Sequence, residues 1–178
     1  PDIRVMAIDT GRLPEETYQC ARDTERRFRI KIEWFFPRHD AVEKLLREQG
    51  TYSFRESIEA RRHCCAIRKV EPQQRALSGL KAWITGARRD QSESRSGLAK
   101  VTRDPAHGGI LKVSPLADWT HDQVWDYIRA HHLPYNRLFD RGFGSIGCEC
   151  CTRAVESGEH PRAGRWWWEK AEHKECGL

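Results

Sequence analysis

The residues best suited to chemistry are the cysteines, of which the 178-residue chain has seven. Cys64 and Cys65 are adjacent, and Cys148 and Cys151 form a C-x-x-C pair far downstream. Four thiolates satisfy either a tetrahedral zinc ion or an iron–sulfur cluster. Adjacent cysteines are awkward ligands for one zinc ion but can bind two different irons, which favours the cluster. Cys150 lies inside the C-x-x-C pair and could replace one of its members as a ligand.

Two further cysteines stand apart from this set. Cys176 occurs alone in Lys174-Glu-Cys-Gly-Leu178, close to His173. Nearby cations favour a thiolate, so Cys176 suits a nucleophile. A terminal cysteine without a chemical role is the alternative. Cys20 falls in an expected helix, where a small core residue is the simplest interpretation.

The composition is that of a soluble globular protein, with 38% apolar and 32% charged residues. We find no membrane-length apolar run and no signal peptide, so we expect a cytoplasmic protein without a disulfide framework. The net charge of +5 favours a phosphate- or sulfate-bearing ligand but is too small to indicate nucleic acid. Because Pro1 is followed almost at once by an apolar run, we expect that an N-terminal segment is missing.

Apolar runs alternate with helical patterns, which predicts an α/β fold with a mainly parallel sheet flanked by helices. Helices are expected to begin near Pro14, after a cap at Asp40, and after a capping box at Thr120. From Gly142 onward we expect an irregular tail. The expected strands cover residues 3–8, 30–36, 80–85 and 110–113. Ligands of such sheets bind beyond the carboxyl ends of the strands, where Asp9-Thr-Gly-Arg12 and Gly86-Ala-Arg-Arg89 fall.

Five motifs in one order give the chain a family resemblance. The set resembles the bacterial-type, thioredoxin-dependent adenylyl-sulfate (APS) reductases of the PAPS/APS reductase family. The resemblance begins at Asp9-Thr-Gly-Arg12-Leu13-Pro14 and extends to Leu178. The five motifs are Cys64-Cys65, Arg88-Arg89-Asp90-Gln91-Ser92, Cys148-x-x-Cys151, Arg165-Trp-Trp-Trp168 and Glu175-Cys-Gly-Leu178.

The resemblance implies an adenine-nucleotide alpha-hydrolase-like fold, related to the ATP pyrophosphatases, in one domain over residues 1–178. It implies that a phosphate-binding loop is missing upstream, and that residues 142–178 form a cluster-binding and catalytic segment. It implies a [4Fe–4S] cluster, with Cys176 as the catalytic nucleophile. The implied cluster ligands are Cys64, Cys65, Cys148 and Cys151.

The implied reaction reduces adenosine 5′-phosphosulfate to sulfite and AMP through a cysteine S-sulfonate, with thioredoxin or glutaredoxin as the reductant. The phosphosulfate needs fixed cations, which arginine supplies in bidentate geometry. Arg162 and Arg165 are three residues apart, so one turn could direct both at one anion. Lys69 should share a helix face with Cys65. The expected substrate-binding residues are Lys69, Arg88, Arg89, Arg162, Arg165, Asp9, Gly11 and Arg12.

Three alternatives stay open from the residues. A zinc-stabilised nucleic-acid-binding module would explain the charge and four cysteines, but gives Cys176 no role. A tRNA-thiolating relative would need a complete phosphate loop and no terminal Glu-Cys-Gly-Leu. Relatives that reduce phosphoadenylyl sulfate (PAPS) typically lack the two cysteine pairs. We therefore expect neither a nucleic-acid nor a membrane partner, while a homo-oligomer is left open.

Overall fold

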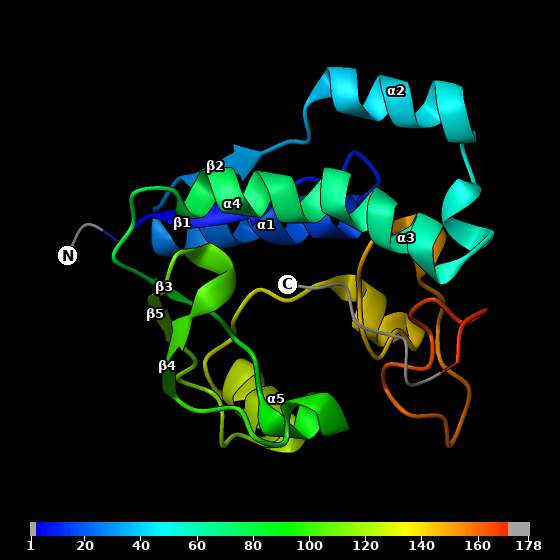
Figure 1. Cartoon of the computed structure of the whole chain (residues 1–178). Helices are drawn as coiled ribbons and strands as arrows, with labels where there is room; N and C mark the ends of the chain where they lie inside the picture. Colours follow the sequence, from blue (N-terminus) through cyan, green and yellow to red (C-terminus); the bar gives the residue numbers. More distant parts are fainter. Residues whose placement is uncertain (1–2, 171–178) are drawn as a thin grey trace. The chain divides into compact units, whose positions relative to one another are not determined.

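The computed structural model describes residues 3–170, which fall into two compact units (Figure 1). The first contains the described residues up to Ala76 and those from Asn136 onward, and the second is Leu77–Tyr135. In residues 3–170 no helix has the length and apolar character needed to cross a bilayer. The single domain over 1–178 and the segment 142–178 stay predictions, and Cys176 lies outside the described residues.

A parallel pair of strands forms the sheet of the first unit. Strand β1 (Val5–Ile8) pairs with β2 (Ile32–Phe35), in register from Val5 opposite Ile32 to Ile8 opposite Phe35. Helix α1 (Glu15–Phe28) connects them, with Pro14 before its first turn and two glutamates within that turn. Proline and acidic residues there suit the free N–H groups and the helix dipole. The two strands and the crossover helix predicted from the sequence are confirmed.

Helix α2 (His39–Gln49) follows β2 and ends at Gly50, whose φ of 82° needs glycine. The sequence predicted Asp40 as the N-cap of this helix, and that prediction is wrong. Arg38 holds that position, and Asp40 lies in the first turn. A carboxylate is also favourable there because it faces the positive end of the helix dipole.

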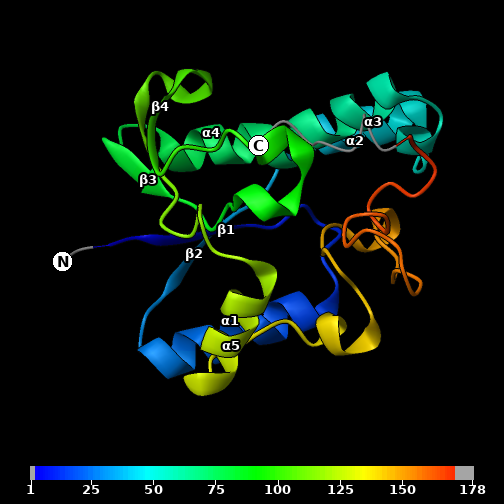
Figure 2. The same ribbon diagram turned by 90° about the horizontal axis from the view of Figure 1, so that it is seen from below.

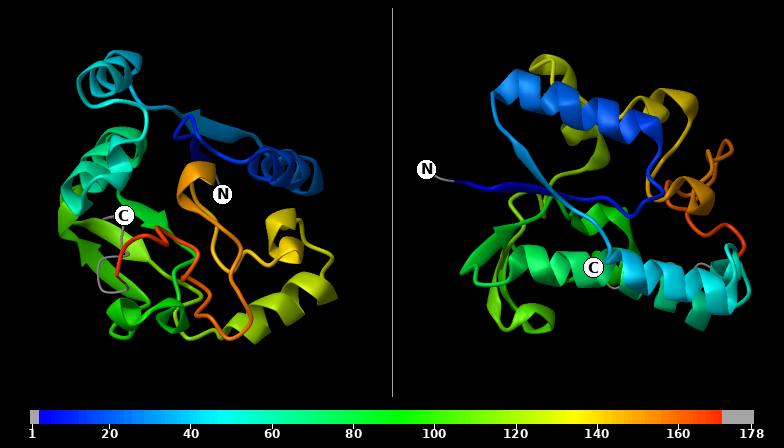
Figure 3. Two further views of the ribbon diagram at one scale, coloured as in Figure 1. Left: turned by 90° about the vertical axis from the view of Figure 1, so that its right-hand side faces the viewer. Right: turned by 90° about the horizontal axis from the view of Figure 1, so that it is seen from above.

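A long helix with a π-helical centre carries the first cysteine pair. Helix α3 (Ile58–Cys65) begins after Ser57, whose hydroxyl accepts a hydrogen bond from the Ala60 N–H at 3.0 Å. It continues without a gap through the π-helix η2 (Ala66–Val70) into α4 (Glu71–Leu77). Figures 2 and 3 show this helix and α1 on opposite sides of the two strands. π-turns are rare overall, but those that occur are often found at functional sites. The presence of η2 therefore marks this stretch of helix as a candidate functional region.

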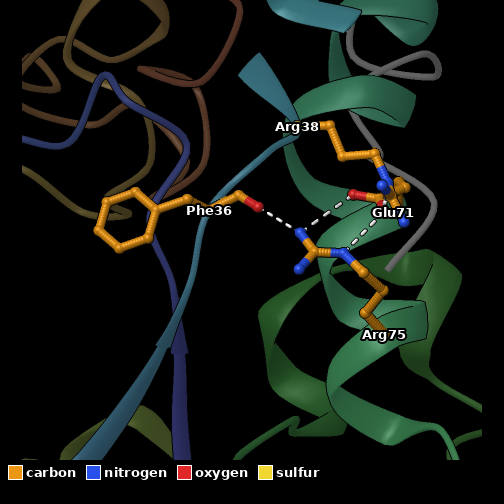
Figure 4. A network of polar contacts seen from close by, with 4 residues as sticks. All are labelled: Phe36, Arg38, Glu71 and Arg75. Carbon is orange, nitrogen blue, oxygen red and sulfur yellow. Dashed lines mark hydrogen bonds and ion pairs between the residues drawn. The ribbon is translucent and has the colours of Figure 1, made fainter. Parts of the chain in front are cut away.

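An exposed polar network joins α4 to the end of β2 (Figure 4). Arg75 donates to the Phe36 carbonyl and forms an ion pair of 2.7 Å with Glu71. Arg38 adds a contact of 3.2 Å to the same carboxylate. Ion pairs this accessible to water contribute about 0–1 kcal/mol each to folding stability. The main effect of the network is therefore to hold the chain at the end of β2 next to α4.

The second unit contains a mixed three-stranded sheet. Strand β3 (Ala82–Ile84) runs parallel to β5 (Ile110–Val113), as expected from the sequence. Strand β4 (Val101–Asp104) pairs antiparallel with β5 and was not predicted. Its first three residues are exposed, so it lacks the apolar alternation by which strands are recognised.

Helix α5 (His121–Ala130) begins with the predicted capping box, in which Thr120 accepts from the Gln123 N–H at 3.2 Å. Residues 143–170 are irregular, as expected for this part of the chain, apart from one turn of 3-10 helix and an antiparallel bridge between Thr152 and Arg165. The 3-10 helices are η1 (Ser53–Arg55), η3 (Arg89–Gln91), η4 (Glu93–Arg95), η5 (Pro105–His107), η6 (Arg137–Arg141) and η7 (Glu149–Cys151).

Candidate functional site

Five cysteines of the first unit line one cavity, called the cysteine cavity below. Cys64 and Cys65 are the last residues of α3, whereas Cys148 precedes η7 and Cys151 ends it. The segment around residue 150 lies beside the end of α3 in Figure 1. These four cysteines are only 7–8% exposed, whereas Cys150 is half-buried. Burial therefore separates the four predicted ligands from the fifth thiol.

The loop after β1 forms one wall of the cavity. Asp9 is buried, and its carboxylate accepts hydrogen bonds of 2.7 Å from the Gly11 N–H and from the Tyr18 hydroxyl. Burial and this carboxylate raise the pKa of Tyr18 to about 12. Gly11 has a φ of 71°, and Thr10 Oγ1 lies 3.2 Å from Cys148 Sγ. Asp9 thus shapes the turn that brings Thr10 to a cysteine.

Arg12 fastens the second cysteine pair to this loop. Its carbonyl accepts a hydrogen bond of 2.8 Å from the Glu149 N–H, and its Nη1 lies 3.7 Å from Cys150 Sγ. Its Nη2 donates to the Thr51 carbonyl at 2.9 Å. The side chain predicted to bind substrate therefore contacts the half-buried thiol.

Three buried cations surround the thiols. Arg68, Lys69 and Arg165 are each less than 9% exposed, and none forms an ion pair with a carboxylate within residues 3–170. Arg68 donates to the Thr10 carbonyl at 2.7 Å, and Arg165 to the Ile146 carbonyl at 3.1 Å. The Nε atoms of both arginines are buried without a hydrogen-bond partner in the described part of the chain. Because burying an unpaired cation is costly, the cavity favours negative charge on its sulfur atoms or on a ligand.

The thiols respond unequally to this field. A hydrogen bond from Cys151 lowers the pKa of Cys148 to about 5, and the nearby charges of Lys69 and Arg165 act in the same direction against burial. A hydrogen bond from Cys151 likewise lowers the pKa of Cys150 to about 6. The pKa of Cys151 is raised because its thiol donates to both neighbours. The cavity therefore stabilises thiolate sulfur on the C-x-x-C segment.

Backbone packing at Trp166 closes the cavity. This residue is 1% exposed and has a φ of 41°, a conformation that strains a bulky side chain by about 1–3 kcal/mol. The Trp166 N–H donates to the Cys151 carbonyl at 3.0 Å, which holds the strained residue against the cysteine segment. Two glycines permit this packing. A Cβ at Gly147 would overlap the Arg165 guanidinium, and one at Gly164 would overlap the Arg153 carbonyl oxygen.

A buried ion pair joins α3 to the last described turn. The Arg61 guanidinium donates to both carboxylate oxygens of Glu169, at 3.0 Å and 2.9 Å, and lies 4.6 Å from the Trp166 ring centre. Burial alone would lower the pKa of Arg61, but the pair with Glu169 and the contact with Cys65 raise it. Arg61 is therefore a permanent cation on the cavity wall.

A model of the phosphoadenosine phosphosulfate reductase domain matches residues 1–154. The chain belongs to this family. It is 49% identical to the adenosine 5′-phosphosulfate reductase of Burkholderia cepacia, over 99% of this chain and 70% of the relative. It is 48% identical to the protein of that name from Allochromatium vinosum, over 99% of this chain and 68% of the relative.

The fold agrees with this family assignment. A crystal structure of the phosphoadenylyl-sulfate reductase of Candida auris superposes with a TM-score of 0.69 and 28% identity, over 86% of this chain and 71% of that chain. The α/β, adenine-nucleotide alpha-hydrolase-like fold class predicted from the sequence is confirmed.

The structure places the predicted site residues of this reductase-family chain in two groups. Most belong to the cysteine cavity or its border. Arg165 acts on Cys148 from beside the cavity, and Arg162 precedes it by one turn, in which the Arg165 N–H donates to the Arg162 carbonyl at 3.0 Å. Asp9 and Gly11 form the turn next to the cavity. The predicted residues that line the cavity itself are Cys64, Cys65, Cys148, Cys151, Lys69 and Arg12.

Arg88 and Arg89 lie in the second unit and have partners there. Arg88 forms an ion pair of 2.9 Å with Asp90. Arg89 is paired with Asp118 and donates to the Leu98 carbonyl at 2.8 Å. These contacts fix the loop after β3, and the roles of both arginines in substrate binding stay predictions.

Several residues in or beside the cavity were not given a role from the sequence. Arg61 and Arg68 had a usable signal, because each lies four residues from a cysteine of the adjacent pair and thus on the same helix face. Thr10 and Trp166 appeared only as members of longer motifs, and Glu169 had no signal, since its place depends on contacts between distant segments.

Gly164→Ala should destabilise the protein by about 1–3 kcal/mol or more, because the new methyl group meets backbone rather than a movable side chain. Chemical denaturation of the full-length protein measures the loss. Gly97→Ala is the matched control, since a methyl group at Gly97 would have no atom within 4 Å and its φ is not positive. Equal unfolding free energies for both variants would contradict the packing argument.

Proposed function

We propose that this protein reduces adenosine 5′-phosphosulfate to sulfite and AMP in sulfate assimilation. The observation that carries the proposal is that two cysteine pairs, distant in sequence, line one buried cavity. Relatives named adenosine 5′-phosphosulfate reductase are 48–49% identical to nearly the whole chain. The protein is accordingly an oxidoreductase that acts on a sulfur group.

The residues of the cavity fit a [4Fe–4S] cluster. Cys64, Cys65, Cys148 and Cys151 would hold it, because four nearly equally buried thiols are the donor set that such clusters use. The uncompensated cations around them would balance the negative charge of a thiolate-bound cluster. When bound, the cluster would supply a fixed charge and a rigid shape to the cavity.

Substrate binding would use cations, because the phosphosulfate carries two adjacent anionic groups. Lys69 is on the cavity wall, Arg165 lies near Cys148, and Arg162 is one turn from Arg165. Arg88 and Arg89 belong to the second unit, where they pair with Asp90 and Asp118, and their part in substrate binding stays a prediction from the sequence. Asp9 and Gly11 would act indirectly, by holding the turn that presents Thr10 and Arg12.

The chemistry would proceed through Cys176. Its thiolate would attack the sulfate sulfur, and the S–O bond would break with its electron pair leaving on AMP. A thiolate of thioredoxin or glutaredoxin would then attack the Cys176 sulfur and release sulfite. The second thiol of the reductant would resolve the mixed disulfide, so the dithiol would supply both electrons. We place this reaction in the cytoplasm.

Phosphoadenylyl sulfate is the second candidate substrate, since the matching family model and the Candida auris structure carry that name. The two cysteine pairs favour the nucleotide without the 3′-phosphate, because relatives that reduce the phosphorylated one typically lack them.

The full-length protein should release sulfite from adenosine 5′-phosphosulfate faster than from its 3′-phosphorylated form. Cys176→Ser should abolish release, because serine is far less acidic than cysteine. Cys20→Ser is the control and should keep activity, since Cys20 lies in α1 with its pKa raised by burial. Mass spectrometry of wild-type protein with substrate alone should locate one sulfonate on Cys176. A sulfonate on Cys150, or full turnover by Cys176→Ser, would refute the assignment.

Anaerobically purified protein should contain about four irons per chain. Cys64→Ser and Cys148→Ser should lose iron, because each removes a buried thiol of the predicted set. Cys150→Ser should retain it, since this thiol is half-buried and lies outside the predicted ligand set, although it contacts both Arg12 and Cys151. Iron and sulfide analysis, with the visible absorption spectrum, measures the result. Stoichiometric zinc, or iron loss from Cys150→Ser alone, would show that the ligand set is wrong.

A further inference from the structure

The ion pair between Arg61 and Glu169 is the most deeply buried in the described part of the chain. The two side chains are 1% and 4% exposed, whereas the other bidentate pair of this segment, Arg153 with Glu159, is 34% and 29% exposed. Both oxygens of Glu169 accept from Arg61. A buried pair in this geometry is costly to form but restricts the two groups to one arrangement.

The pair joins helix α3, which carries the adjacent cysteines, to the turn between Trp166 and Glu169. Arg61 lies one helical turn before Cys65 and interacts with it. Glu169 belongs to the turn that begins at Trp166, where the Glu169 N–H donates to the Trp166 carbonyl at 2.8 Å. Trp166 in turn donates to the Cys151 carbonyl. Glu169 is thus tied to both cysteine pairs, through α3 and through η7.

Glu169 also precedes Cys176 by seven residues. Seven residues span at most roughly 25 Å, so the position of Glu169 limits where the thiol can go. A thiol restricted to a small volume reacts as if more concentrated, because the entropy of bringing it to its target is already lost.

We infer that Arg61 and Glu169 form a positioning pair, which fixes the base of the segment that carries Cys176 to the helix that carries Cys64 and Cys65. The inference rests on the proposed function of Cys176. Neither residue touches the reacting atoms in this assignment. The pair acts on the rate at which Cys176 meets the sulfate sulfur, and not on nucleotide affinity.

Glu169→Gln tests the pair in the full-length protein, with Glu159→Gln as the matched control. Two readouts are needed. Trypsin cleavage after Lys170, followed by mass spectrometry without nucleotide, reports whether the chain next to Glu169 is held. The single-turnover rate of sulfonate formation on Cys176, measured beside the nucleotide dissociation constant, reports positioning.

We expect Glu169→Gln to speed cleavage after Lys170 and to slow sulfonate formation on the order of tenfold, with nucleotide affinity changed by less than about twofold. Glu159→Gln should match wild type in each measurement. The double variant Arg61→Gln/Glu169→Gln separates positioning from stability. The double variant also removes the buried charge of Arg61, which no longer faces a carboxylate in Glu169→Gln. Its melting temperature should therefore be higher than that of Glu169→Gln, while its rate of sulfonate formation stays as low as in that single variant.

The outcomes distinguish the two proposals. Wild-type cleavage and sulfonate rates in Glu169→Gln would overturn the positioning pair and leave the proposed function standing. Recovery of the sulfonate rate together with stability in the double variant would overturn it too, because the pair would then be structural alone. Absence of any sulfonate on Cys176 in wild-type protein would overturn the proposed function, and with it the positioning pair.

Discussion

The first unit depends on how three buried cations are balanced. Arg68, Lys69 and Arg165 have no carboxylate partner within residues 3–170, and five thiols line the cavity beside them. A buried charge without a partner costs several kcal/mol, so the cavity favours negative charge on its sulfur atoms or on a bound ligand. The cations therefore favour the deprotonated sulfur that metal binding needs. Metal binding and the stability of this unit are therefore coupled, because both depend on the attraction between the buried cations and deprotonated sulfur.

The backbone supplies these cations and thiols from four separate segments. The turn after β1 presents Thr10, α3 with its π-helical continuation presents Cys64 and Arg68, and η7 presents Cys151. The π-helical stretch η2 directly follows the adjacent cysteines and contains two of the cations, Arg68 and Lys69. Glycines at 147 and 164 then let the last segment approach closely enough to add Arg165. Each of these features is local in the sequence, but the cavity forms only when the folded unit brings them together.

Much of this arrangement could be predicted from local signals. Thr120 and Gly50 marked helix ends because capping and left-handed φ depend on few neighbours. Strand β4 was missed because its side chains face solvent, and Asp40 was taken for a cap because its position one residue inside α2 cannot be read from composition. The two cysteine pairs could be recognised in the sequence as a candidate site. The Arg61–Glu169 pair could not, because its residues are 108 positions apart and neither belongs to a short sequence motif.

The strained backbone at Trp166 follows from the same geometry. A tryptophan with a φ of 41° persists only where surrounding contacts outweigh the strain. Its N–H is held by Cys151, its ring lies 4.6 Å from the guanidiniums of Arg61 and Arg165, and its carbonyl accepts from Glu169. Every one of these contacts leads to a cysteine pair or to a cation beside one. The backbone of Trp166 thus joins the cysteine segment to Glu169, and its indole packs against the arginine that pairs with Glu169.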